Sequence, residues 1–375
     1  MHTQKSKFQR ISYLDSLRGI AALMVVFYHF LGWKYPDKLI IKISNFVFNG
    51  SDAVSFFFVL SGLVLSYPYL QLNRPLDIGK FYINRIFRLY PAFWIALILV
   101  VLYVNRFGIS AAPLATLFNL FISNKHGVWE EALLIRGRSG FLGLGWTLTI
   151  EIVMSFFIPF LIAAVYANRR IIIWFVFSTF ILSHIFSIFL FPFVLGILIS
   201  VFFEKINNDQ FRETVWFRKR VLFLIFGIIL FSIRHIDKIF PFGEKYHSIT
   251  SFLNLDFFTF TAIGSFIFLV YTIHFRSVQK FLMHPILLYF GKISYGIYLV
   301  HWLIVMAIFD YWDRIIVFFP NIETSFITML ILCLTTTIIL ATAIYYWVEL
   351  PLIKRGKHFT EKIKPTLVIS DKAQI

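Results

Sequence analysis

The chain has 375 residues, of which 59% are hydrophobic and only 14% are charged, against about 25% charged residues in an ordinary soluble protein. This composition excludes a soluble globular enzyme, and the apolar blocks are long enough to cross a hydrocarbon core, which takes roughly 20 helical residues. The net charge of +16 argues for basic loops on one side of a membrane and not for nucleic-acid binding, since no long basic segment lies outside the apolar blocks.

The apolar blocks predict an all-α, polytopic transmembrane helical bundle of about ten spans. Residues 1–11 are expected to form a cytoplasmic N-terminal segment, 12–351 the transmembrane domain, and 352–375 a cytoplasmic tail. A further apolar piece, 113–122, is too short to span and is predicted to be re-entrant. The predicted spans are 12–31, 44–70, 81–104, 143–166, 171–187, 189–203, 219–234, 251–274, 285–310 and 323–348.

The basic residues predict the orientation of the bundle. Most of the 35 Lys and Arg residues fall in segments on the side of the N-terminus, so both termini are expected to be cytoplasmic. The first span contains Asp15 and Arg18 and lacks a small-residue cleavage site, which favours a retained helix over a signal peptide. The longest outer loop, 105–142, is either a solvated connector or a cover for a bound glycan.

Two ionisable residues interrupt the first span. Arg18 lies near its start and His29 near its end, ~16 Å apart along a helix that rises ~1.5 Å per residue. Ionisable groups within a bilayer usually face a polar interior or a water path. A lone histidine on an apolar helix is more often a hydrogen-bonded packing residue, so the role of His29 depends on its neighbours.

Two carboxylates are predicted to lie at the depth of His29. Asp52 begins the second span and Glu151 begins the fourth, and both spans enter from the outer side in the predicted orientation. Either carboxylate could orient the His29 imidazole, which would then act as a general base toward a hydroxyl. The polar residues would then form an outer layer of imidazole and carboxylates and an inner layer of guanidinium groups.

The third span opens with two arginines. Arg85 and Arg88 are three residues apart, so they share one helix face and could bind a phosphate group together. The alternative is that both side chains extend to the cytoplasmic interface and anchor the helix.

The later spans hold further polar residues. His301 lies in the middle of the ninth span, where a packing hydrogen bond is the expected role. Glu349 closes the last span and is expected to be structural. The single cysteine, Cys333, excludes an intrachain disulfide.

These stretches, taken in order, resemble acyltransferase family 3, a family of integral membrane acyltransferases. The resemblance runs from about Tyr13 to Pro351. It rests on Arg18 and His29 in the first span, Asp52 followed by Phe56-Phe57-Phe58-Val59-Leu60-Ser61-Gly62, Arg85 and Arg88 followed by Tyr90-Pro91, Trp146 to Glu151, and Ile293-Ser294-Tyr295 through His301 to Glu349.

The resemblance implies transfer of an acyl group, most often acetyl from acetyl-CoA, to a hydroxyl of an extracytoplasmic glycan such as O-antigen or exopolysaccharide. It implies that His29 is the essential catalytic residue and that Arg85 and Arg88 act on the CoA side, where Arg18 would also contact the donor. No metal is expected. The expected location is the bacterial inner membrane, in contact with membrane lipid.

Some members of the family carry a fused hydrolase-like domain that completes the transfer. Its absence from this chain favours direct transfer within the membrane domain or handover to a partner protein. A polytopic transporter of a glycolipid or small solute is the alternative function, although no internal repeat supports it. A non-catalytic scaffold is a third.

Overall fold

The structure is a computed structural model of the whole chain. Its described residues are 11–34, 43, 44, 46, 48–104, 128–135, 142–186, 189–208, 211, 214, 218–239, 257–365 and 367–369. The predicted re-entrant piece 113–122 and most of the predicted outer loop lie outside these ranges.

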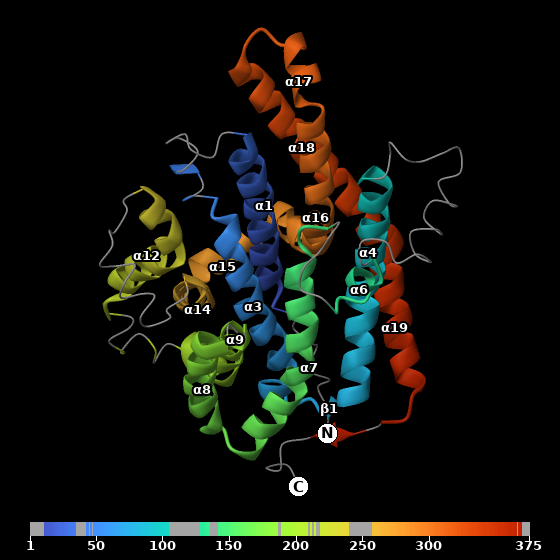
Figure 1. Cartoon of the computed structure of the whole chain (residues 1–375). Coiled ribbons are helices and arrows are strands. Elements are labelled where there is room, and N and C mark those ends of the chain that lie inside the picture. The colour runs from blue at the N-terminus through green and yellow to red at the C-terminus, as the bar shows by residue number, and fades with distance from the viewer. Residues whose placement is uncertain are drawn as a thin grey trace.

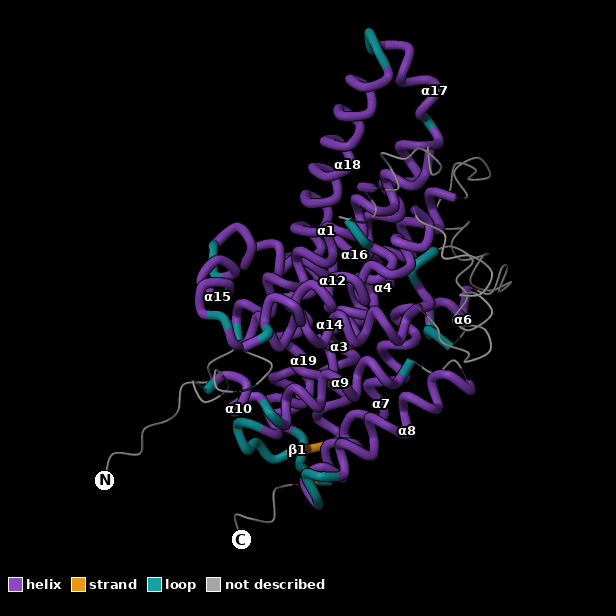
Figure 2. The backbone as a smooth tube through the Cα atoms, turned by 90° about the vertical axis from the view of Figure 1, so that its left-hand side faces the viewer, coloured by secondary structure: helices purple, strands orange, loops and turns teal. Residues whose placement is uncertain are grey.

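The described residues form a helical bundle with two very short strands (Figure 1). The hairpin of α16 and α18 extends beyond the other helices at one end of the bundle in both views (Figures 1 and 2). The elements in chain order are α1 (Ser12–Lys34), α3 (Gly50–Leu70), β1 (Leu76–Asp77), α4 (Ile78–Val104), α6 (Val128–Ala132), α7 (Gly145–Ala167), α8 (Ile171–Phe186), α9 (Leu190–Val201), α10 (Phe203–Asn207), α12 (Arg220–Ile239), α14 (Phe257–His274), α15 (Arg276–Leu282), α16 (Pro285–Asp310), α17 (Trp312–Ile315), η3 (Ile316–Phe318), α18 (Ile322–Ile344), η4 (Tyr345–Glu349), α19 (Leu350–Lys362) and β2 (Val368–Ile369).

The all-α membrane class is confirmed, and the span count is not. Among the described helices, six are long and apolar enough to cross a membrane, or seven if α14 and α15, bent by 95°, count as one broken span. Each of the ten predicted segments contains a helix, but α8 and α9 have only 16 and 12 residues. Helices this short do not reach across a 30 Å hydrocarbon core at 1.5 Å per residue. The orientation of the termini stays a prediction.

The C-terminal part of the chain continues as helix where a tail was predicted. α18 leads through the π-helical turn η4 into α19, so helix continues to Lys362. Gly356 of α19 lies against Phe87 of α4, where a Cβ would come within 2.7 Å of the Phe87 Cβ. β2 then pairs antiparallel with β1, which ties residues 368–369 to the start of α4.

Helices α1 and α16 run parallel and cross closely at two glycines. A Cβ on Gly19 would lie 2.7 Å from the Gly291 backbone nitrogen, so no side chain fits between the two helices there. Ser16 also donates a 2.6 Å hydrogen bond to the Leu282 carbonyl, which holds the start of α1 against the end of α15. This crossing fixes the register of the two helices that carry His29 and His301.

Helices α3 and α9 also make contact through glycine. A Cβ on Gly196 would overlap the Val59 carbonyl oxygen, and one on Gly62 would overlap the Phe193 carbonyl oxygen. Such small-residue contacts allow membrane helices to approach backbone to backbone.

Replacing Gly196 with Ala is expected to lower the free energy of unfolding by about 1–3 kcal/mol, because the helix backbones must separate. Equilibrium unfolding in SDS mixed micelles would measure the loss. Gly227→Ala on α12 is the matched control, since its Cβ would meet the Ile267 side chain at 2.9 Å and a side chain can move. Equal losses in the two variants would contradict the backbone contact.

Candidate functional site

A pair of histidines lies where α1 and α16 pack together. His29 Nδ1 lies 3.1 Å from His301 Nε2, and the two rings are stacked with centroids 5.2 Å apart. His301 is fully buried, and its other nitrogen, Nδ1, lies 2.8 Å from the Tyr298 carbonyl. A packing hydrogen bond was predicted for His301, and the structure gives one to the carbonyl of its own helix, together with a contact to His29 that was not predicted.

The histidine pair is enclosed by aromatic side chains. The Trp302 ring meets the His29 ring edge-on at 5.3 Å, and Gly143 lies under Trp302, where a Cβ would come within 2.8 Å of the indole. The Tyr298 ring lies 5.8 Å from the His301 ring.

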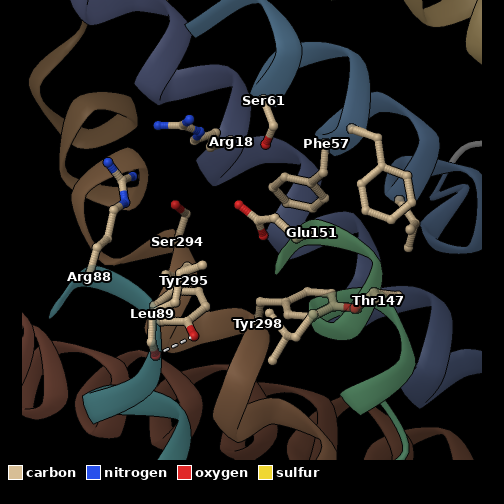
Figure 3. Close-up of a pocket in the computed structure, with 13 residues that line it drawn as sticks. Arg18, Phe57, Ser61, Arg88, Leu89, Thr147, Glu151, Ser294, Tyr295 and Tyr298 are labelled. Atoms are coloured by element: carbon tan, nitrogen blue, oxygen red, sulfur yellow. Dashed lines mark hydrogen bonds between the residues drawn. The ribbon is translucent and has the colours of Figure 1, made fainter. Parts of the chain in front are cut away.

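A small cavity of about 80 Å³ is lined by charged, polar and apolar side chains (Figure 3). In Figure 3 the Arg18 and Arg88 guanidinium groups lie at one side of the cavity, and Phe57, Tyr298 and Thr147 lie at the other, with Glu151 between them. The side chains come from α1, α3, α4, α7 and α16, so five helices converge on it.

One residue, Tyr298, connects the cavity with the histidine pair. Tyr298 lines it and is hydrogen bonded at 2.6 Å to Thr147, and the same tyrosine ring contacts His301. Arg18 and His29 are eleven residues apart, about three helical turns, so both project from one face of α1. The arginines therefore share the cavity with Tyr298, and Tyr298 connects it by ring contact to His301, although neither histidine lines the cavity.

The two arginines of α4, Arg85 and Arg88, lie in different environments. Arg85 Nη2 lies 2.7 Å from Glu151 Oε1 and donates at 2.8 Å to the Ser155 hydroxyl. Arg88 lines the cavity with Arg18, and Arg85 does not. The structure thus brings Arg18 and Arg88 together in the cavity, in place of the predicted pair Arg85 and Arg88.

The prediction that Glu151 lies beside His29 is wrong. Glu151 is paired with Arg85, so the expected division into a carboxylate layer and an arginine layer is also wrong for this residue. The reason is the start of α7, where Leu142 and Leu144 are buried and Gly143 packs against Trp302. α7 therefore begins near the histidines, and Glu151 lies about 9 Å further along it.

Asp52 also lies apart from His29. Its Oδ1 accepts a 3.3 Å hydrogen bond from the Thr261 hydroxyl, and its Oδ2 lies 3.8 Å from His235 Nε2. The Tyr28 ring contacts both the His29 ring, at 5.5 Å, and the His235 ring, at 5.9 Å. One aromatic residue therefore separates the Asp52 cluster from His29.

Sequence reasoning missed the polar stripe of α16. Tyr295, Tyr298 and His301 are spaced three residues apart, so they share a helix face. Tyr295 donates at 2.7 Å to the Leu89 carbonyl (Figure 3) and lines the cavity. The spacing was a usable signal, because polar groups repeated at three residues within an apolar span mark a buried polar face.

Comparisons with known proteins identify the family of the chain. A family model described as an acyltransferase domain matches residues 11–346. A protein of Staphylococcus aureus (strain COL), provisionally named as an O-acetyltransferase, is 25% identical over 394 aligned residues, which cover 94% of this chain and 59% of that protein. "O-acetyltransferase PaAT-1" of Phomopsis amygdali is 36% identical over 85 residues, covering 20% of this chain and 17% of that protein. No solved structure matches the chain significantly.

Proposed function

The chain belongs to the acyltransferase domain family, as an O-acyltransferase with membrane-spanning helices, and from this we propose that it moves an acetyl group from cytoplasmic acetyl-CoA to a hydroxyl of an extracytoplasmic glycan. The observation that carries the proposal is that Arg18, Arg88 and Tyr298 line one cavity, while Tyr298 also contacts His301, the partner of His29. The relatives it matches support acetyl as the acyl group. The transporter alternative gains no support from these matches.

The donor would enter from the arginine end. Guanidinium groups bind phosphate through charge-assisted hydrogen bonds, so Arg18 and Arg88 would hold the CoA phosphates. The cavity of about 80 Å³ is far below the 300 Å³ or more of a whole small-molecule site, so only the narrow pantetheine arm would enter it. That arm, roughly 15–20 Å when extended, matches the ~16 Å rise from Arg18 to His29.

The transfer would occur at His29. As general base, its free ring nitrogen would take the proton of the acceptor hydroxyl while that oxygen attacks the thioester carbonyl. The C–S bond breaks, the ester forms, and the CoA thiolate leaves and takes up the proton. In the covalent alternative the same nitrogen carries the acetyl group between donor and acceptor. Both routes need an unprotonated nitrogen at His29.

Purified protein supplied with acetyl-labelled acetyl-CoA and surface glycan from its source organism would test the proposal. We expect label in the glycan as an ester that mild base releases, and a mass increase of one acetyl group at modified residues. Retention of all label in acetyl-CoA, with folded protein and several glycan classes supplied, would refute it.

Arg88→Ala is expected to weaken acetyl-CoA binding at least tenfold, because a hydrogen bond to a charged group contributes about 1.5–3 kcal/mol. The KM for acetyl-CoA should rise more than kcat falls, since the phosphate contact is the same before and during the reaction. Arg276→Ala, at an exposed position on α15, is the matched control. An unchanged KM in Arg88→Ala would contradict the role of Arg88.

A further inference from the structure

The hydrogen bonds of His301 determine which of its nitrogens carries hydrogen. His301 Nδ1 lies 2.8 Å from the Tyr298 carbonyl oxygen and 3.2 Å from the Ile297 carbonyl oxygen. A carbonyl only accepts, so the hydrogen is on Nδ1. A neutral imidazole has one donor and one acceptor, and Nε2 of His301 is therefore the acceptor.

The position of the hydrogen on His301 also determines which nitrogen of His29 carries hydrogen. His29 Nδ1 faces the His301 Nε2 acceptor at 3.1 Å, so it is the His29 Nδ1–H that donates. No described carboxylate contacts either ring, so the pair has no anionic partner among the described residues, and a neutral imidazole carries a single hydrogen. The lone pair of His29 then resides on Nε2.

We propose that His301 is a positioning residue, which fixes His29 in the Nδ1–H tautomer and leaves the His29 Nε2 lone pair free to act as base or nucleophile. Second partners that fix a histidine tautomer are a recurrent device in histidine sites. The chemical use of the lone pair rests on the proposed function, while the tautomer itself follows from the contacts alone.

The surroundings hold the pair in this geometry. The Gly19–Gly291 crossing sets the register of α1 and α16, and each histidine lies ten residues beyond its glycine. Trp302 lies against the edge of the His29 ring and is itself packed on Gly143. His301 is therefore held by its own helix backbone and presents Nε2 in a fixed direction.

Nitrogen NMR of the full chain, with ¹⁵N-labelled histidine in nanodiscs, tests the tautomer directly. The chain has 10 histidines, and the signals of His29 are those that disappear in His29→Ala. We expect a His29 Nδ1 signal coupled to a proton and a His29 Nε2 signal typical of an unprotonated nitrogen. A protonated Nε2 on His29 would overturn the proposal.

Two substitutions of His301 test the consequence. In His301→Gln the amide oxygen can take the place of the Nε2 acceptor, so kcat should stay within about tenfold of the natural protein. In His301→Leu no acceptor remains, the His29 tautomer should become mixed, and kcat should fall about 100-fold, the lower end of the usual contribution of a general base. The KM for acetyl-CoA should stay unchanged in both, because the arginines are untouched.

The NMR spectrum and the two His301 variants test the role of His301, whereas the transfer assay tests the proposed function. Natural activity and an unchanged tautomer in His301→Leu would overturn the role of His301, as would equal losses in the Gln and Leu variants when both remain folded by thermal unfolding. If the natural protein transfers no acetyl group at all, the proposed function fails, and the nitrogen spectrum still decides the tautomer.

Discussion

His29→Ala is expected to lower the rate of acyl transfer about 10²–10⁴-fold while the protein stays folded in the membrane. His29 contacts His301, and His301 contacts the cavity-lining Tyr298, so His29 lies next to the residues that would hold the donor. His301 is not expected to replace it, because the His301 side chain is fully buried and its Nδ1 stays bonded to the Tyr298 and Ile297 carbonyls of its own helix. The rate would be measured as labelled ester formed per amount of folded protein.

The matched control is His358→Ala. The His358 side chain is 68% exposed on α19 and should be replaceable with no change in rate. A natural rate in His29→Ala, with the control also at the natural rate, would show that His29 takes no part in the reaction.

Glu151→Ala is expected to lower the free energy of unfolding by about 3–5 kcal/mol, because it leaves the Arg85 guanidinium buried without its carboxylate. Arg85 is 9% exposed, and the pair is separated by only 2.7 Å. Unfolding in SDS mixed micelles would measure the loss. Activity should fall as well, since Glu151 lines the cavity.

The double variant Arg85→Met, Glu151→Met separates charge from packing. With neither charge buried, its loss should be clearly smaller than the sum of the two single losses. Lys80→Ala is the control on the same helix, because its pair with Asp77 spans 3.9 Å and is more exposed, so its removal should change stability by less than about 1 kcal/mol. A similarly small effect of Glu151→Ala would contradict a structural ion pair.

The sequence predicted the parts of the molecule that depend on local pattern. Apolar blocks predicted the membrane helices, and the spacing from Arg18 to His29 predicted two polar groups along one helix. The charges also predicted an arginine-lined inner region, of which Arg18 and Arg88 line the cavity.

The features that were missed depend on where a helix begins and on contacts distant in sequence. The sequence placed Glu151 beside His29 because it gave the wrong depth for the start of α7. The connection from Leu142 to Leu144 is apolar and buried, so in the sequence it looks like the first residues of the membrane span. His301 was expected only to pack, because its partner is 272 residues away. Composition and periodicity carry no information about pairings at that distance.

The parallel packing of α1 on α16 has a consequence for biosynthesis. His29 is made early and its partner 272 residues later, which takes roughly 15–55 s at 5–20 residues per second. During that interval the nascent chain holds His29 without its hydrogen-bond acceptor and without the tyrosines that line the cavity. Chains released before α16 therefore lack a complete histidine pair, so the centre can form only on molecules synthesised nearly to their end.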